Sequence, residues 1–536
     1  MAEQFTEKEK EILLQFCTNV DSDCFALINL PEVVKGALFS RYSRSSLSLR
    51  RLLLNEFINN PESGFTDLVA NKTVTDQIIA TKKAEEFYDR VLIGYGDDSV
   101  AELGGAHLAA ENISILLTKY LQDSRIGISP LEKSTRYVFF DQKENGGYKY
   151  LKEKKIMASA FAGEYQRVCD LLFETYSSLI QPLSKLEEEK NPPPTDVSER
   201  AYKASIRAKV CDILRGILPA STLTNAGFFG NGRAFEYMLA KLYASPLSEA
   251  REFAQKAHEE LSKVIPSFVK RANDKYGKEL QSYLAQCHQA ISQIASSLPQ
   301  LQQQVRAEPQ VLLIDYDKDA YDKVIAAILF PHSRVCMSEI LQQVAALSKQ
   351  EKQKILTAYV GNRSNRRQKP GRAFEIPYYT FCITGNFGMY RDLHRHRILT
   401  QERQLLSTKH GFDMPQEIVE AGFEDKVQAA VEAADRLYSE MSSQMPYEAQ
   451  YVVPLGCRMR WYMRMNLREA YHLCELRSMR QGHKDYRKVA QEIHRLISSV
   501  HPELAEGMKF VDYQDYELER LEAEKKLDKK LQQLKK

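Results

Sequence analysis

The chain has 536 residues, more than one hydrophobic core normally supports, so at least two domains are expected. Its 74 Lys and Arg residues nearly balance 71 Asp and Glu residues, and the net charge of +3 excludes a general nucleic-acid coat. Any anion site must therefore come from local clustering of cations. The nine cysteines contain no CxxC pair and predict neither a zinc site nor a disulfide framework. With no run of about 18 apolar residues, the chain is expected to be cytoplasmic, with no membrane partner.

In the first half, the β-branched and aromatic residues of TRYVFF at 135–140 predict a strand. Segments 165–188 and 247–300 carry apolar residues at three- and four-residue spacing, which is typical of amphipathic helices. Between them, the prolines near 190–197 predict an exposed excursion of the chain. A second break near 298–310 holds two prolines and few bulky apolar residues, and it predicts the main domain boundary.

In the second half, VLLIDYD at 311–317 and YYTFCIT at 378–384 predict strands, and 424–444 and 466–500 predict helices. The expected fold is α+β, dominated by helices, with mixed or antiparallel sheets. The expected divisions are an N-terminal domain at 1–304, a C-terminal domain at 305–515 and a charged helical tail at 516–536.

The densest cluster of cations is RDLHRHR at 391–397. Its guanidinium groups suit phosphate or carboxylate, and its imidazoles can donate to heteroatoms of a nucleotide. A solvated basic turn is the alternative interpretation. A second basic cluster, from Arg363 to Arg372, is interpreted as a polar loop, with steering of anions toward the site as the alternative. His472 and His483 are interpreted as histidines on a helix surface.

The two halves share a pattern. Leu218-Pro219 is followed, twelve residues after the proline, by Asn231-Gly232-Arg233, and Val453-Pro454 is followed at the same spacing by Asn466-Leu467-Arg468. Each Asn-x-Arg is expected to open a helix, and asparagine is a good N-cap in its own right. The repeated spacing favours two copies of one ancestral unit.

Further motifs make the repeat specific. A second-half Arg395-His396-Arg397 is followed eight residues later by Leu405, whereas Ser134-Thr135-Arg136-Tyr137 in the first half is preceded, at that spacing, by Ser124-Arg125-Ile126. The chain thus resembles two fused copies of the flavin-dependent thymidylate synthase family, whose pattern is Arg-His-Arg, a serine eight residues later, and then x-Arg-Tyr. Each half keeps the part of this pattern that the other has lost.

The same division recurs downstream. The family has an arginine four residues before the repeated proline, where the first half has Arg215 and the second has Gln450. It has another arginine eleven residues after the repeated asparagine, where the first half has Leu242 and the second has Arg477. Because the family builds each site from neighbouring subunits, the resemblance implies one composite site for each fused chain.

The resemblance implies a role for each retained motif residue, and no metal. The expected catalytic residues are Ser134, Arg215 and Arg477, with Ser134 as a hydrogen-bonding group rather than a nucleophile. Nucleotide binding is expected from Glu132, Ser134, Thr135, Arg136, Arg215, Arg395 and Arg477. Flavin binding is expected from Ser99, Glu102, Arg395, His396, Arg397, Asn466 and Arg468.

The family reaction transfers a methylene from 5,10-methylenetetrahydrofolate to carbon 5 of dUMP with reduction by FADH2, and NADPH is the expected reductant. A homodimer of the fused chain is expected if the four-copy assembly of the family survives. Asp392 stands where the family commonly has glutamine, and an acid there would repel phosphate unless it pairs with Arg395. The alternatives are a flavoenzyme that methylates another pyrimidine nucleotide and a non-catalytic descendant that binds nucleotide.

Overall fold

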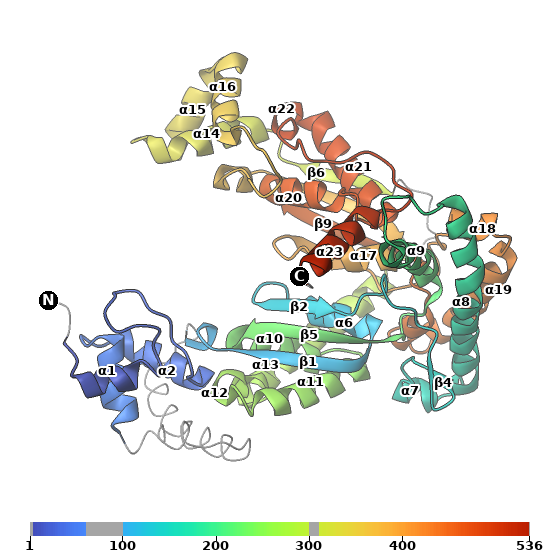
Figure 1. Cartoon of the computed structure of the whole chain (residues 1–536), viewed down its shortest axis with the longest axis horizontal. Coiled ribbons are helices and arrows are strands. Elements are labelled where there is room, and N and C mark those ends of the chain that lie inside the picture. The colour runs from blue at the N-terminus through green and yellow to red at the C-terminus, as the bar shows by residue number, and fades with distance from the viewer. Residues whose placement is uncertain (1–3, 61–99, 300–309, 535–536) are drawn as a thin grey trace. The chain divides into compact units, whose positions relative to one another are not determined.

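The computed structural model describes residues 4–60, 100–299 and 310–534 (Figure 1). The chain folds into two compact units that alternate along the sequence. The first comprises Met1–Ile113, Tyr120–Lys133 and Thr224–Gln303, and the second comprises Ser114–Lys119, Ser134–Leu223 and Gln304–Lys536. The second unit therefore contains a long segment from the first half of the sequence. In the described ranges, no helix combines the length and the hydropathy needed to cross a bilayer.

The first unit begins with a small helical cluster. Thr6 and Glu9 form a capping box at the start of α1 (Glu7–Leu13). Fully buried Val34, Leu38 and Phe57 are among the residues that form the core between this helix and the next ones. The following elements are α2 (Glu32–Tyr42), α3 (Leu49–Leu52), the π-helix η1 (Leu53–Ile58) and the 3₁₀-helix η3 (Val100–Glu102).

A three-stranded sheet with the order β1-β5-β2 follows, and β2 pairs antiparallel with β5. Its strands are β1 (Gly105–Ser114), β2 (Ile128–Glu132) and β5 (Leu223–Asn231). The helices of this unit are α10 (Gly232–Tyr243), α11 (Ser248–Leu261), α12 (Pro266–Val269), the 3₁₀-helix η5 (Lys270–Ala272) and α13 (Lys275–Ser296), together with the end of α6 (Ile115–Gln122), whose first five residues belong to the second unit. The helix predicted over 247–300 is wrong as a single element, because Pro266 starts a new helix and Asp274 caps another.

The second unit contains a four-stranded antiparallel sheet with the order β6-β7-β9-β8. Its strands are β6 (Val311–Tyr316), β7 (Tyr378–Asn386), β8 (Thr400–Arg403) and β9 (Arg458–Asn466). The strands predicted at 311–317 and 378–384 are thus confirmed. Alternate residues of the central strands, such as Phe381 and Trp461, are buried, as expected for a sheet that covers a core.

Helices make up most of the second unit. They are α7 (Lys154–Met157), α8 (Ala162–Lys190), α9 (Glu199–Leu214), η4 (Arg215–Ile217), α14 (Ala320–Leu329), η7 (Phe330–His332), α15 (Met337–Ala346), α16 (Lys349–Val360), η8 (Arg372–Glu375), α17 (Phe387–Leu393), α18 (Gln416–Glu420), α19 (Glu424–Ser442), η9 (Glu448–Val452), α20 (Leu467–Arg477), α21 (Lys484–Val500), α22 (Pro502–Ala505) and α23 (Leu521–Leu534). A short hairpin pairs β3 (Lys143–Glu144) with β4 (Gly147–Tyr148).

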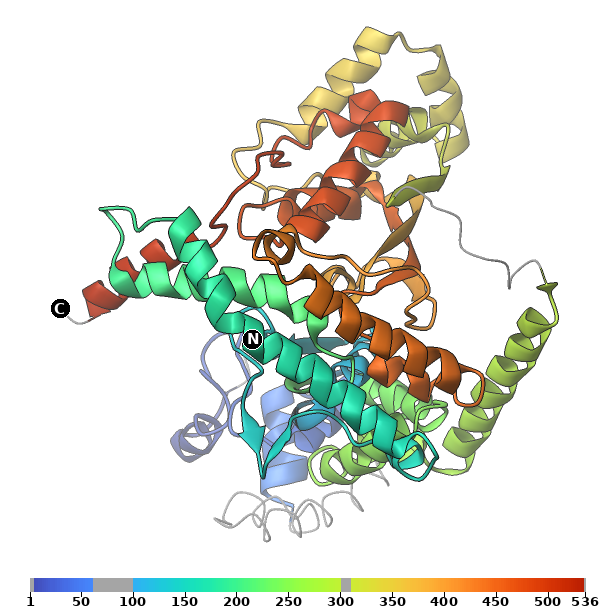
Figure 2. The same cartoon turned by 90° about the vertical axis from the view of Figure 1, so that its right-hand side faces the viewer.

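Most of the predicted helices in this unit are confirmed. The segments 165–188 and 424–444 form α8 and α19, and the two helices lie side by side (Figure 2). The segment 466–500 forms two helices because the chain breaks around Gly482, where the buried His483 caps α21. The interpretation of His483 as a helix-surface residue is therefore wrong.

The two copies meet through their repeated proline segments. Pro219 and Pro454 form an antiparallel bridge with each other. The flanking hydrogen bonds are reciprocal: Ala220 N donates to Val453 O at 2.9 Å, and Leu455 N donates to Leu218 O at 2.9 Å. Equivalent residues of the copies thus contact one another, as they do at a two-fold interface between identical subunits. This pairing brings Arg215, four residues before Pro219, into the unit that holds the second copy.

The strand predicted at 135–140 is wrong, because strand β2 ends at Glu132 and an irregular turn follows. Side chains satisfy the backbone there: Arg136 N donates to Ser134 Oγ at 3.1 Å, and Phe140 N donates to the Tyr176 hydroxyl at 3.4 Å. A local side-chain hydrogen bond such as the one to Ser134 competes with strand pairing.

Candidate functional site

A pocket of about 330 Å³ lies around the Arg395-His396-Arg397 turn between α17 and β8. One side of α20, from its N-cap to its last residue, and the end of the 3₁₀-helix η8 form its other walls. Its lining residues are Lys369, Glu375, Arg395, His396, Arg397, Ile398, Asn466, Arg468, Glu469, His472, Leu476 and Arg477. Five cations against two carboxylates make this pocket suited to an anionic group.

Asn466 and Arg468 lie at the start of α20. The Asn466 side chain accepts a hydrogen bond from Glu469 N at 2.8 Å and so caps the helix. Arg468 donates to Pro370 O at 2.8 Å and pairs with Glu375 at 3.3 Å. The predicted helix start at Asn466 is confirmed, and the equivalent Asn231 caps α10 through a 2.8 Å hydrogen bond from Ala234 N.

His396 is buried and uses both ring nitrogens. Its Nδ1 lies 2.5 Å from Glu469 Oε1, and its Nε2 accepts a hydrogen bond from Arg477 Nε at 2.9 Å. Burial, followed by the positive charges of Arg477 and Lys369, holds the pKa of His396 well below its usual value. The imidazole is therefore neutral at physiological pH.

His396, Glu469 and His472 have ligand atoms within 4.8 Å of one another, a spacing at which three such groups can hold a metal ion. His396, however, already uses both nitrogens in hydrogen bonds. The surrounding Lys369, Arg468 and Arg477 also disfavour a bound cation. The pocket chemistry thus favours an anion over a metal.

Burial raises the pKa of Glu469 to about 7, and the nearby cations oppose this rise only in part. A carboxyl whose pKa rises from 4.5 on folding binds more protons in the folded state, so stability falls as pH rises from about 4.5 to about 7. Glu469→Gln should remove this loss, which is about 3 kcal/mol at pH 8. Urea unfolding of wild type and of Glu469→Gln between pH 5 and 8 measures this loss of stability. Free energies of unfolding that change with pH in parallel for the two proteins would contradict the prediction.

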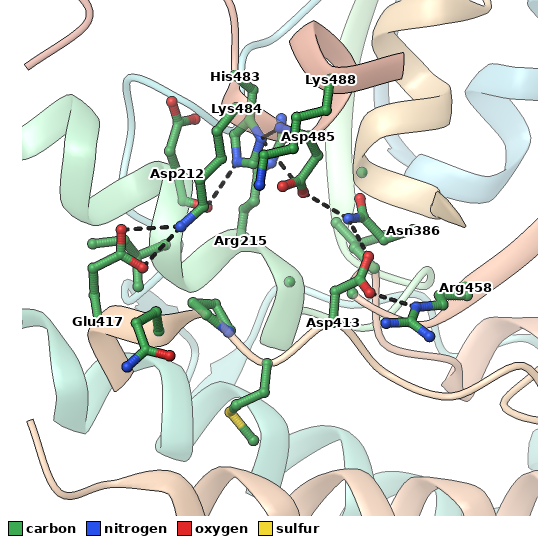
Figure 3. A pocket seen from close by; sticks show the side chains of 18 of the residues that line it. Asp212, Arg215, Asn386, Asp413, Glu417, Arg458, His483, Lys484, Asp485 and Lys488 are labelled. Atoms are coloured by element: carbon green, nitrogen blue, oxygen red, sulfur yellow. Dashed lines mark hydrogen bonds and ion pairs between the residues drawn. The ribbon is translucent and has the colours of Figure 1, made fainter. Parts of the chain in front are cut away.

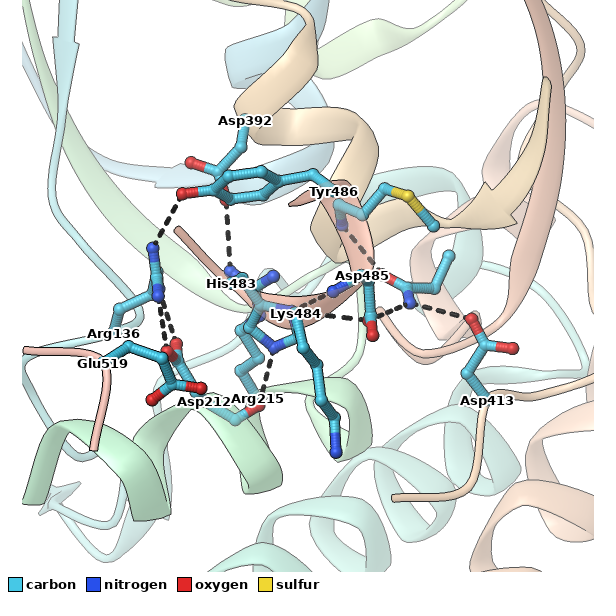
Figure 4. Close-up of polar contacts among 12 residues, drawn as sticks. Arg136, Asp212, Arg215, Asp392, Asp413, His483, Lys484, Asp485, Tyr486 and Glu519 are labelled. Atoms are coloured by element: carbon cyan, nitrogen blue, oxygen red, sulfur yellow. Dashed lines mark hydrogen bonds and ion pairs between the residues drawn. The ribbon is translucent and has the colours of Figure 1, made fainter. Parts of the chain in front are cut away.

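A second cluster lies at the serine loop of the first copy (Figure 4). Arg136 donates to Asp212 through Nε and Nη2, both at 2.6 Å, and the two side chains are each 9% exposed. Burial raises the pKa of Asp212, but the charge of Arg136 outweighs burial and holds that pKa below its usual value. Arg136 also donates to the Tyr486 hydroxyl at 3.2 Å, and Arg477 lies 5.7 Å from the centre of the Tyr486 ring.

Asp392 joins the arginines of the two copies. Its carboxylate lies 3.4 Å from Arg215 Nη1 and 3.9 Å from Arg395 Nη2. Burial raises the pKa of Asp392, but Arg215, Arg136, Arg395 and Arg477 together outweigh burial and lower it. We call these four residues the four-arginine cluster. Its members come from both copies, two of them contact the Asp392 carboxylate and the charges of all four act on it, and Arg215 Nη2 is a buried nitrogen without a hydrogen-bond partner in the described structure.

A larger cavity of about 560 Å³ adjoins this cluster through Arg215 (Figure 3). Most of the charged side chains that line this cavity form hydrogen bonds or ion pairs with one another. Asn386 donates to both Asp413 at 2.8 Å and Asp485 at 2.7 Å, and Lys484 contacts both Glu417 oxygens at 3.0 Å. This cavity therefore holds mostly matched charges, in contrast to the cationic pocket around His396.

The structure brings together most of the residues predicted for the site. Arg136, Arg215, Arg395 and Arg477 form the four-arginine cluster, and His396, Arg397, Asn466 and Arg468 line the adjoining pocket. Ser134 accepts from Arg136 N, and Thr135 Oγ1 accepts from Arg391 Nη1 at 3.2 Å. In the first unit, Glu132 accepts from Gln122 at 3.3 Å and Glu102 pairs with Arg233 at 2.8 Å. Ser99 lies outside the described residues.

The positions where motif residues are absent serve the fold instead. Gln450, in place of the upstream arginine, is buried, and its Oε1 accepts from Leu406 N at 3.0 Å. Leu242, in place of the downstream arginine, is a core residue of the first unit. Gln450 therefore binds the backbone and Leu242 packs in the core, and neither side chain carries a positive charge that could bind an anion.

Sequence reasoning missed Asp212, Glu469 and Tyr486, and it misjudged Arg363. Arg363 belongs to the basic cluster interpreted as a polar loop, but its side chain is 2% exposed and pairs with Glu475. A signal existed for Asp212, which precedes Arg215 by three residues: Asp212 lies in the last turn of α9, and Arg215 is the first residue of η4, which follows directly. For Glu469, the sequence gives no signal beyond its position as the third residue of α20.

Comparison with known proteins agrees with this architecture. The family model described as "Thymidylate synthase complementing protein" matches residues 58–267 and 312–503. A UPF0159 protein of Chlamydia pneumoniae is 45% identical over 524 residues, which covers 97% of this chain and 98% of the relative. A UPF0159 protein of Thermoplasma acidophilum is 34% identical over 517 residues, which covers 91% and 97%.

The fold and the two matches define a tandem protein with two copies of one flavin-dependent thymidylate synthase-like unit. The chain belongs to the thymidylate synthase complementing protein family. The resemblance inferred from the sequence motifs, and the expected helix-dominated α+β fold, are confirmed.

Proposed function

We propose that the chain is an FAD-dependent thymidylate synthase with one composite site, which transfers a methylene from 5,10-methylenetetrahydrofolate to carbon 5 of dUMP. The observation that carries this proposal is the four-arginine cluster, to which each copy contributes two residues. We assign the copies to 1–304 and 305–515 and the tail to 516–536. NADPH as reductant and a homodimer of the fused chain complete the proposal.

The charges of the cluster suit a nucleotide monophosphate. Four guanidinium groups face two carboxylates, Asp212 and Asp392, which leaves two positive charges in the cluster. A phosphate monoester carries about two negative charges at neutral pH. Arginine binds phosphate oxygens through paired donors, and the unpartnered Nη2 of Arg215 is one such donor.

The pocket around His396 fits part of a flavin dinucleotide. Its five cations supply the donors that a diphosphate requires, and about 330 Å³ is enough for a section of the cofactor rather than all of it. His396, Arg397, Asn466 and Arg468 would hold this group. When bound, the flavin supplies the carbon-carrying and hydride chemistry of the reaction.

The residues of the chain have a positioning and electrostatic role in this reaction. Arg136, Arg215 and Arg395 bind and orient the nucleotide phosphate. The Ser134 hydroxyl donates a hydrogen bond to the same phosphate. Arg477 stabilises negative charge that develops on a carbonyl of the pyrimidine ring. The buried side chains of Arg136 and Arg215 exclude water, which strengthens their interactions with the phosphate, whereas the exposed Arg395 lies at the solvent side of the cluster.

The proposal is tested by the absorbance spectrum of the purified protein and by anaerobic titration of the photoreduced flavin with deoxyuridylate. We expect a flavin spectrum, and we expect its oxidation rate to change when nucleotide is added. Protein that takes up no flavin after incubation with excess FAD would contradict the proposal and favour a nucleotide-binding descendant without catalysis.

A further inference from the structure

Three side chains form a continuous hydrogen-bonded line from the His396 pocket to the four-arginine cluster. Glu469 lies 2.5 Å from Nδ1 of His396, and Nε2 of His396 accepts from Arg477 at 2.9 Å. Glu469 is the third residue of α20 and Arg477 is its last, so His396 bridges the two ends of one helix. Among the described residues, Glu469 pairs with His396 and forms no hydrogen bond or ion pair with Arg136, Arg215 or Arg395.

The donors in this line fix where the imidazole proton sits. A guanidinium is an obligate donor, so Nε2 of His396 must accept from Arg477. A neutral imidazole then carries its proton on Nδ1, and Glu469 accepts it. In the opposite tautomer, the Nε2 proton would face the N–H of Arg477, and the two donors would repel each other.

Arg477 depends on this contact more than its neighbours depend on theirs. Arg136 is fixed by two hydrogen bonds to Asp212, whereas in the described ranges Arg477 has no carboxylate within ion-pair distance. Its other neighbours in the cluster are Tyr486, which interacts with Arg477 through its hydroxyl and has its ring centre 5.7 Å away, and the carboxylate of Asp392, which attracts Arg477 without an ion pair in the described residues. Loss of the hydrogen bond to His396 would therefore leave the Arg477 guanidinium with Tyr486 as its one remaining side-chain hydrogen-bond partner among the described residues, and its position would be less fixed.

We propose that Glu469 is a positioning residue for nucleotide binding: by accepting the Nδ1 proton of His396, it fixes the tautomer that holds Arg477 in the four-arginine cluster. This inference rests on the proposed function of the cluster as the nucleotide site. It assigns control of nucleotide affinity to a residue in the wall of the neighbouring pocket.

The first test compares deoxyuridylate binding to flavin-free protein by calorimetry in three variants. Glu469→Ala should weaken binding about tenfold or more, because loss of the acceptor releases His396 and then Arg477. Glu469→Gln should stay within about threefold of wild type, since its amide oxygen still accepts the proton. The matched control is Glu375→Ala, which removes a carboxylate of the same pocket that pairs with Arg468 and does not contact His396.

The second test reads the tautomer directly by NMR of protein labelled with ¹⁵N-histidine, with His396→Gln to assign the signal. We expect an Nδ1-protonated neutral ring in wild type and Glu469→Gln, and an Nε2-protonated ring in Glu469→Ala. An Nε2-protonated ring in wild type would overturn the proposal, as would an unchanged tautomer in Glu469→Ala. Nucleotide binding weakened equally by Ala and Gln would overturn it too.

The two tests separate this inference from the proposed function. Wild-type protein that binds flavin but no deoxyuridylate would refute the nucleotide assignment of the cluster, while the NMR result would still decide whether Glu469 sets the tautomer. Binding that is sensitive to Arg215→Ala but insensitive to Glu469→Ala would support the proposed function and reject the positioning role.

Discussion

Arg215→Ala should abolish detectable deoxyuridylate binding and leave flavin binding unchanged. The Arg215 residue is 4% exposed, contacts Asp392 only at 3.4 Å and keeps a buried Nη2 without a partner among the described residues, so a bound phosphate would supply the acceptor that this nitrogen lacks. Hydrogen bonds between charged groups contribute about 1.5–3 kcal/mol each, so losing two of them should raise Kd by about a hundredfold or more. Calorimetric titration of flavin-loaded protein measures the change.

The matched control is Arg458→Ala. Arg458 lines the larger cavity together with Arg215 but pairs with Asp413 at 2.5 Å, outside the four-arginine cluster. We expect its nucleotide affinity to stay within about threefold of wild type. If both variants weakened binding equally, the larger cavity rather than the cluster would bind the nucleotide.

Arg363→Ala should lower the free energy of unfolding by about 3–5 kcal/mol, because it leaves a buried carboxylate without a partner. Arg363 donates to both oxygens of Glu475, at 2.7 and 2.6 Å, and to Gly507 O at 2.6 Å. The Glu475 side chain is only 1% exposed. Urea unfolding at neutral pH, monitored by circular dichroism, measures the loss.

The double variant Arg363→Met, Glu475→Leu is the control for this prediction. It removes both charges and fills their space with apolar groups, so it should be clearly more stable than Arg363→Ala. A loss below about 1 kcal/mol for Arg363→Ala would contradict a buried ion pair at this position. Glu475 precedes Arg477 by two residues on α20, so the same ion pair also anchors the helix that carries Arg477.

The sequence predicted the members of the four-arginine cluster but not the carboxylates that hold them. The cluster could be predicted because each half of the chain keeps the motif arginines that the other half has lost: the first half keeps Arg136 and Arg215, and the second keeps Arg395 and Arg477. The structure adds the reciprocal pairing at Pro219 and Pro454, which brings segments of both copies into one compact unit.

The carboxylates could not be predicted because they are far from their partners in sequence. Asp212 pairs with a residue 76 positions away, and Glu469 with His396, 73 positions away, so neither pairing leaves a local pattern, and the position of Asp212 three residues before Arg215 does not indicate its partner. The wrong strand at 135–140 has a related cause. Its β-branched and aromatic residues fit a strand by type, but Arg136 is needed for an ion pair and its backbone bonds to Ser134.

The central claim is that each fused chain carries one complete nucleotide site built from both of its copies. Calorimetry with Arg215→Ala, Arg477→Ala and an equimolar mixture of the two, refolded together, tests this claim most directly. We expect wild type to bind one deoxyuridylate per chain, each variant to bind none, and the mixture to bind none. Recovery of binding in the mixture would contradict the claim, because it would show that the two arginines of a site come from different chains.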